Sequence, residues 1–127
     1  MNNQELEKKV TLVINSLIYE QGYICSVDVL LRLEYLSQKD HEDWRHGRVP
    51  FLEKVCKINL KKLSLTNRLI RKFAEQRQLK KSLTEYNQWA TKVKRRLIFS
   101  KSADPNIETH YATHFVDNKR IDELKSK

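Results

Sequence analysis

Apolar residues recur every three or four positions through the first twenty residues, which is the spacing of the buried face of a helix. The pattern predicts a helix over residues 4–20, and Gly22 follows it, where a glycine commonly ends a helix because it adopts a left-handed conformation without strain. The stripe consists of Leu6, Val10, Val13, Ile14 and Leu17.

Two shorter helices are expected next. Ser26 is placed to cap a helix through VDVLLRLEYL, with Asp28 near its positive end. Ser37 and Asp40 have the spacing of a helix cap and predict a third helix in the segment SQKDHEDW. That helix should stop at Gly47.

The longest helical pattern begins at Pro50, whose fixed φ and missing N–H suit the first position of a helix. From Pro50 to Arg77 the chain contains no Gly and no further Pro, and an apolar and a basic stripe stay in phase throughout. This favours one central helix of roughly 40 Å at 1.5 Å per residue. Two helices separated by a kink or turn around residues 63–66 are the alternative. The apolar stripe consists of Leu52, Val55, Cys56, Leu63, Ile70, Phe73 and Ala74.

The last third of the chain mixes helical and strand signals. Ser82 and Glu85 form a capping box that predicts a helix with Tyr86 and Trp89 on one face. The β-branched and aromatic residues of 96–100 favour a short strand. Asp104 and Pro105 then predict a further helix, and its rival is a strand in THYATHFV, where apolar and polar residues also alternate. Residues 118–127 are expected to be a frayed tail.

The expected fold is therefore mainly α, with one helical domain over residues 1–117. It is a bundle of five or six helices around the long central helix, with room for a short strand or hairpin near the C-terminus. Large side chains are needed to bury enough area in a small domain, and Trp44, Phe73 and Trp89 are the expected core anchors. With 39% hydrophobic and 32% charged residues, the composition is that of a globular chain rather than a disordered one.

Targeting signals and cysteines point to the cytoplasm. No stretch approaches the roughly 20 apolar residues of a membrane span, and the first residues, MNNQELEKKV, lack the pattern of a signal peptide. Cys25 and Cys56 are too few and too isolated for a disulfide scaffold. We expect a cytoplasmic protein with two reduced thiols and no membrane partner.

The positive charge of the chain is concentrated in its middle third. The net charge is +9, and residues 51–101 carry 15 Lys or Arg against 3 Asp or Glu. Such asymmetry suggests nucleic acid as a partner, bound through its phosphates. A solvated face that only keeps the protein soluble is the alternative. The residues expected to contact nucleic acid are Lys54, Lys57, Lys61, Arg68, Arg71, Lys72, Lys94, Arg95 and Arg96.

A second class of function stays open, because Ile58 and Leu65 fall near the basic side of the central segment. Apolar residues in that position could form a seam for a partner protein or for a second copy of the chain. A protein–protein adaptor or homodimer with no role in nucleic-acid binding is therefore the alternative to the phosphate-binding module.

The segment DWRHGRVPFLE is a candidate anion site. Arg45, His46 and Arg48 precede the expected helix start at Pro50, where free N–H groups and the helix dipole attract negative charge. The alternative is a turn neutralised from within, because Asp43 can pair with Arg48 and Glu53 lies in the first turn.

Catalytic and metal-binding patterns are weak. His110 and His114 have a spacing that can hold zinc on a helix, but the sequence offers no evident third ligand. The chain has no glycine-rich phosphate loop and no nucleophile elbow. We predict no catalytic residue, no metal and no cofactor, and an enzyme is less favoured than a binding module.

Several stretches resemble a family of small uncharacterised bacterial proteins, with a similarity that covers about residues 22–116. They are GYICSVDVLLRL, DWRHGRVPFLE, NLKKL and FSKSADPNIETHYATHFV. The resemblance implies no activity, but it does imply that the DWRHGRVPFLE cluster and the FSKSADP turn belong to one design. Two departures put the local turns in doubt: this chain has Ala103 and Ala90 where the family usually has Gly.

Overall fold

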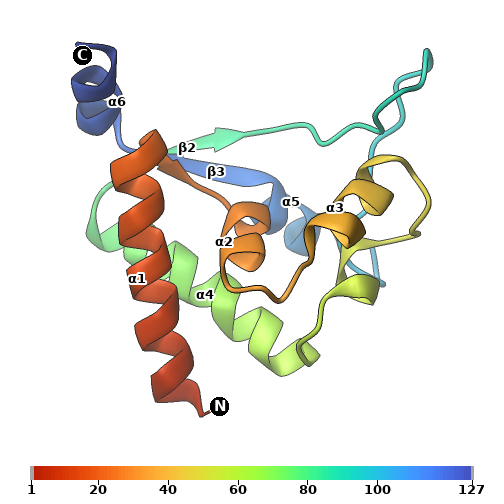
Figure 1. The fold of residues 1–127 in the computed structure, drawn as a ribbon, viewed down its shortest axis with the longest axis horizontal. Coiled ribbons are helices and arrows are strands. Elements are labelled where there is room, and N and C mark those ends of the chain that lie inside the picture. Colours follow the sequence, from red (N-terminus) through yellow and green to blue (C-terminus); the bar gives the residue numbers. More distant parts are fainter. Residues whose placement is uncertain (1, 127) are drawn as a thin grey trace.

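A computed structural model describes residues 2–126, and it confirms that the chain is mainly helical (Figure 1). The described part of the chain contains six α-helices, one 3-10 turn and three short strands. The helices are α1 (Asn3–Gln21), α2 (Ser26–Arg32), α3 (Gln38–Arg45), α4 (Leu60–Gln76), α5 (Pro105–Ala112) and α6 (Asn118–Lys125). The 3-10 turn is η1 (Leu52–Val55), and the strands are β1 (Tyr23–Ile24), β2 (Lys80–Leu83) and β3 (Thr113–Val116).

The three strands form one antiparallel sheet in the order β1-β3-β2. Phe115 of the central strand β3 lies opposite Ile24 on one side and Lys81 on the other. The N–H of Asp117 donates to the carbonyl of Gly22 at 2.8 Å. The sheet thus joins a segment near the start of the chain to one near its end.

Two groups of buried side chains form the core. In the first, Leu6, Val10 and Ile14 of α1 pack against Ile70 and Ala74 of α4. The second surrounds the fully buried Trp44 and contains Leu52, Tyr86, Phe99 and Tyr111. The indole N–H of Trp44 donates to the carbonyl of Ile98 at 2.8 Å, so this large side chain leaves no buried donor unpaired.

Several helix-end signals in the sequence are confirmed, but the cap expected at Ser26 is not, because Ser26 is the first residue of α2 and that helix has no side-chain cap. Gly22 ends α1 with a φ of 79°. The Ser37 hydroxyl accepts from the N–H of Asp40 at the start of α3. The carboxylate of Asp104 caps α5 by accepting from the N–H groups of Asn106 and Ile107. The second helix is shorter than expected and ends at Arg32, and Glu34 beyond it has a φ of 64°.

The prediction of one central helix from Pro50 to Arg77 is wrong. Pro50 begins no helix, η1 covers only Leu52–Val55, and α4 begins at Leu60. Asn59 caps α4, because its side chain accepts from the N–H of Lys62 at 2.9 Å. The break therefore lies at residues 56–59 and not at residues 63–66.

Long-range backbone bonds explain this break. The N–H groups of Leu52 and Glu53 donate to the carbonyls of Ile98 and Phe99, and the N–H of Lys57 donates to Tyr35. A continuous helix from Pro50 would need the N–H groups of Glu53 and Lys57 for its own ladder, whereas the N–H of Leu52 would lie in the first turn, where it has no partner within the helix. The apolar residues of η1 thereby pack around Trp44 rather than along α1.

The predicted helix after the capping box at Ser82 is also wrong. Strand β2 occupies residues 80–83, because its backbone pairs with β3 instead. An irregular hairpin follows, with a bridge between Asn87 and Arg96, so only Arg96 of the strand expected at residues 96–100 pairs in this way. Trp89 at the far end of this hairpin is 39% exposed and is no core anchor.

The C-terminal segment differs from expectation in two respects. Residues 105–116 contain both alternatives, because α5 runs directly into β3. Residues 118–125 form α6 rather than a frayed tail, and α6 lies beside the C-terminal end of α1 (Figure 1). Arg120 of α6 donates through Nε to the carbonyl of Tyr19, and its guanidinium lies 4.4 Å from the centre of the Tyr19 ring. No helix in the described range 2–126 has the length and apolar character needed to cross a membrane.

Candidate functional site

Three cations form a ridge on the outer face of α4. Lys61, Arg68 and Lys72 are all exposed, and they are spaced seven and four residues apart. At 3.6 residues per turn this spacing places them within about 40° of one another around the helix axis. We call these three residues the α4 ridge.

The α4 ridge is not neutralised by nearby acids. Within residues 2–126, no carboxylate lies within 4.0 Å of the charged nitrogens of Lys61, Arg68 or Lys72. The basic run of the hairpin differs, because Glu85 pairs with Lys94 at 2.6 Å and with Arg96 at 3.4 Å. Hydrogen bonding from Lys94 holds the pKa of Glu85 below its usual value. The ridge is thus more available to an outside anion than Lys94 or Arg96.

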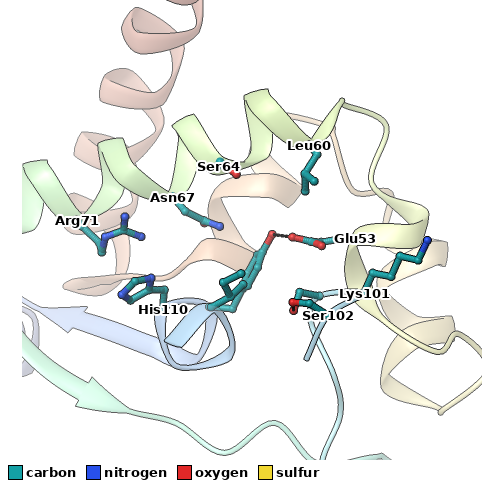
Figure 2. A pocket seen from close by; sticks show the side chains of 11 residues that line it. Glu53, Leu60, Ser64, Asn67, Arg71, Lys101, Ser102 and His110 are labelled. Atoms are coloured by element: carbon teal, nitrogen blue, oxygen red, sulfur yellow. Dashed lines mark hydrogen bonds between the residues drawn. The ribbon is translucent and has the colours of Figure 1, made fainter. Parts of the chain in front are cut away.

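A cavity of about 650 Å³ is lined in part by α4 (Figure 2). Its walls come from four parts of the chain: η1, α4, α5 and the turn that contains Lys101. The residues that line it are Glu53, Leu60, Ser64, Asn67, Arg71, Ser100, Lys101, Ser102, Ile107, His110 and Tyr111.

The α4 ridge and the cavity lie side by side on the same helix. Lys61, Arg68 and Lys72 each directly follow a residue that lines the cavity. Successive residues of a helix differ by roughly 100° in direction. The ridge therefore runs along one margin of the cavity, and a bound chain could contact both.

Cationic and titratable side chains stand at both ends of the cavity. In Figure 2, Arg71 of α4 and His110 of α5 lie close together at one end, and Lys101 lies at the other. No ion pair holds Arg71 or Lys101 within the part of the chain that is described. Desolvation, Arg71 and Lys81 lower the pKa of His110, so its ring is uncharged at neutral pH.

A hydrogen bond fixes the floor of the cavity. The Tyr111 hydroxyl donates to Oε2 of Glu53 at 2.7 Å, and Figure 2 shows this bond. Burial and this bond raise the pKa of Tyr111, so the phenol remains protonated. Asn67 accepts from the hydroxyl of Ser26 at 2.7 Å through its amide oxygen. These bonds hold Glu53 and Asn67 in place at the base of the cavity.

Glu108 supports the turn that carries Lys101. Its carboxylate accepts from the N–H of Phe99 at 2.8 Å, from the N–H of Ser100 at 2.9 Å and from the Ser100 hydroxyl at 2.7 Å. Ala103 completes the turn with a φ of 55°, although it is not a glycine. The position of Lys101 thus depends on an acid of α5 that the sequence did not single out.

The other residues expected to contact nucleic acid are dispersed. Lys54 lies in η1 and Lys57 in the loop that follows, so neither shares a helix face with the ridge. Arg71 lines the cavity instead. Arg95 is exposed in the hairpin, between the two cations that pair with Glu85.

The expected anion site at Arg45, His46 and Arg48 has no helix start beside it, because Pro50 begins no helix. Arg48 pairs with Asp43 at 3.0 Å, as in the neutralised turn that was the alternative. The guanidinium of Arg45 lies 4.6 Å from the centre of the Trp89 ring, and desolvation lowers its pKa. His46 contacts the edge of the same ring. In this structure Arg45 and His46 thus pack against Trp89, and Arg48 pairs with Asp43.

The two histidines with zinc spacing lie in different elements. His110 lies in α5, whereas His114 lies in β3 with its ring 2.8 Å from the Tyr86 hydroxyl. Among residues 2–126 no group of three His, Cys, Asp or Glu side chains is placed to hold a metal ion.

Sequence reasoning missed the cavity, although one signal for it was present. The predicted cap at Asp104 and Pro105 begins α5, and Ile107, His110 and Tyr111 follow on one side of that helix. The sequence shows that these three residues share one side of α5, but it does not show which other parts of the chain face them across the cavity. Comparison with protein-family models, curated proteins and solved structures gives no match to this chain.

Proposed function

We propose that this protein is a non-enzymatic module that binds nucleic acid, and that the α4 ridge contacts the phosphates. The observation that carries the proposal is the alignment of Lys61, Arg68 and Lys72 on one exposed face. No carboxylate of residues 2–126 pairs with them. Exposed, unpaired cations on a rigid helix attract a polyanion without first having to break internal ion pairs.

The spacing of the ridge suits a phosphate backbone. Lys61 and Lys72 are eleven residues apart, which corresponds to roughly 16 Å along a helix. One strand of a duplex carries a phosphate about every 3.4 Å along the axis, but it also winds around that axis, so only some of the phosphates within the span face one side. A ridge of this length can therefore meet phosphates of a duplex at more than one point.

Contacts with phosphates give affinity without sequence specificity. Phosphate contacts set the position of a protein on nucleic acid, whereas base-edge contacts carry sequence information. The ridge has two lysines and one arginine, so only the guanidinium of Arg68 has the geometry for a paired contact with a base edge. We expect binding that depends strongly on salt and only weakly on sequence.

A protein-binding adaptor is the second candidate. The seam first considered for it is weak, because Ile58 and Leu65 are half-buried against the two core clusters. A different surface favours it: Leu12 and Tyr19, seven residues apart on α1, are 69% and 66% exposed. An adaptor of this kind would bind with little dependence on salt.

A charge-matched comparison tests the proposal. The ridge variant carries Lys61→Ala, Arg68→Ala and Lys72→Ala, and the control carries Lys8→Ala, Lys119→Ala and Lys125→Ala. The control lysines are exposed on α1 and α6, so both variants lose three charges and only one loses the ridge. Fluorescence anisotropy would measure affinity for labelled single- and double-stranded DNA and RNA.

We expect the ridge variant to lose more than tenfold in affinity and the control less than threefold. Equal losses in both variants would show that only net charge matters. A wild-type protein that binds none of the four probes would overturn the proposal.

A further inference from the structure

The cavity combines two properties that a simple phosphate track does not need. Arg71 and Lys101 stand at its opposite ends, without ion-pair partners among the described residues (Figure 2). Its lining also includes Leu60 of α4 and Ile107 of α5, which are 62% and 40% exposed. Two large aliphatic side chains at the margin of a hollow give an apolar surface to any flat group that enters.

We propose that the cavity receives a short unpaired segment of a strand that lies along the α4 ridge. Different phosphates of that segment lie near Arg71 and Lys101, and its bases pack against Leu60 and Ile107. This inference rests on the proposed function, and it specifies that the preferred partner is single-stranded.

An unpaired strand matches this distribution of chemistry. It offers anionic phosphates at intervals and apolar base faces beside them, and the cavity offers cations at its two ends and apolar side chains in its lining. A base within a duplex is stacked and paired, and removing it costs a few kcal/mol. A single strand avoids that cost, and apolar packing tolerates every base.

Polar groups at the base of the cavity can meet the edge of a nucleotide base. Oε2 of Glu53 accepts from Tyr111, and the other carboxylate oxygen has no hydrogen-bond partner among residues 2–126. A carboxylate accepts well from the amino group of cytosine. The hydroxyls of Ser64 and Ser102 line the same space. Oligodeoxycytidine is therefore the appropriate probe.

Protonation of His110 should make the affinity for a phosphate in the cavity depend on pH. Desolvation, Arg71 of α4 and Lys81 of β2 lower the pKa of His110, and Asp104 at the start of α5 raises it. A phosphodiester beside Arg71 adds negative charge and so favours the protonated ring. Since binding then takes up a proton, affinity should rise as the pH falls from about 7.5 to about 5.5. The variant His110→Gln should lack this rise.

The test fills the cavity without changing charge. Ser64→Trp places a large ring into the cavity from an exposed position of α4, and Ser16→Trp makes the same change on the exposed surface of α1 as a control. Thermal unfolding would verify that both variants fold. Anisotropy would then measure binding to a labelled strand of ten deoxycytidines and to a labelled duplex of mixed sequence.

We expect Ser64→Trp to weaken single-strand binding at least tenfold and to change duplex binding less than twofold, whereas Ser16→Trp changes neither. If Ser64→Trp binds the single strand as the wild type does, the cavity is not a nucleotide site. The proposed function would still stand in that case, provided that the ridge variant weakens binding to both probes. If the wild type binds neither probe, both proposals fail.

Discussion

Replacing Glu108 with Gln should destabilise the protein, because one carboxylate accepts three hydrogen bonds in the turn that carries Lys101. Oε1 accepts from the N–H of Phe99, and Oε2 accepts from the N–H and hydroxyl of Ser100. An amide has a single acceptor oxygen, and its NH₂ group cannot accept. At least one of the three donors therefore loses its partner and faces another N–H.

The expected loss of stability is about 3 kcal/mol. A hydrogen bond to a charged group contributes about 1.5–3 kcal/mol, and the bonds that remain lose the help of the charge. Phe99 and Ser100 are each only 3% exposed, so water has little access to an orphaned donor in that turn. In a domain of this size, roughly 3–5 °C of Tm accompanies each kcal/mol, which gives a fall of about 10 °C.

Thermal and urea unfolding followed by circular dichroism would measure this loss. Glu75→Gln is the matched control, because Glu75 is exposed on α4 and its side chain has no partner among the residues described. The control should stay within about 0.5 kcal/mol of the wild type. A Glu108→Gln variant as stable as the control would refute the assignment of Glu108 as the support of this turn.

Three further changes probe the packing around Trp44 and the thiols. Trp44→Phe should cost about 2–4 kcal/mol in urea unfolding, because it leaves a void and removes one of the two N–H groups that donate to the buried carbonyl of Ile98. Gly47→Ala should cost about 1–3 kcal/mol, since Gly47 has a φ of 76° and the new Cβ would lie 2.6 Å from the side chain of Gln88; adding Gln88→Ala should restore only part of that loss. Burial raises the pKa of Cys25 and of Cys56 to about 12, so iodoacetamide at about pH 8 should label neither in the native protein and both after unfolding, as counted by mass spectrometry.

Signals that act within a few residues were readable from the sequence. Gly22, the Ser37 cap and the Asp104 cap each depend on bonds to atoms at most four residues away. Such contacts need no distant partner, and in this chain they set the end of α1 and the starts of α3 and α5. The apolar stripe of α1 was also local, because it repeats through one uninterrupted helix.

The prediction of one helix over residues 50–77 failed because contacts with distant residues determine the structure of this segment. The spacing of its apolar residues fits one continuous helix. It fits equally well a short turn and a separate helix, each packed against a different part of the core. Backbone bonds from Leu52 and Glu53 to residues 98 and 99 favour the second arrangement, and they join positions over forty residues apart. Pairing of β2 with β3 overrode the capping box at Ser82 in the same way.

The same distinction between local and distant contacts applies to the candidate site. The α4 ridge was readable because its three cations share one helix and differ only by whole turns. The cavity was not, since its walls come from η1, α4, the Lys101 turn and α5. The sequence also does not show which of the central cations form ion pairs. Glu85 pairs with Lys94 and Arg96 because all three lie in a hairpin that the sequence did not predict.

The salt dependence of binding tests the central claim most directly. The logarithm of the association constant for a DNA duplex would be measured against the logarithm of salt concentration, for the wild type and the Lys61→Ala, Arg68→Ala, Lys72→Ala variant. Each phosphate contact contributes about 0.9 to the slope, so the variant should have a slope shallower by about 2–3. Parallel lines for the two proteins would contradict direct contact between these three residues and phosphates.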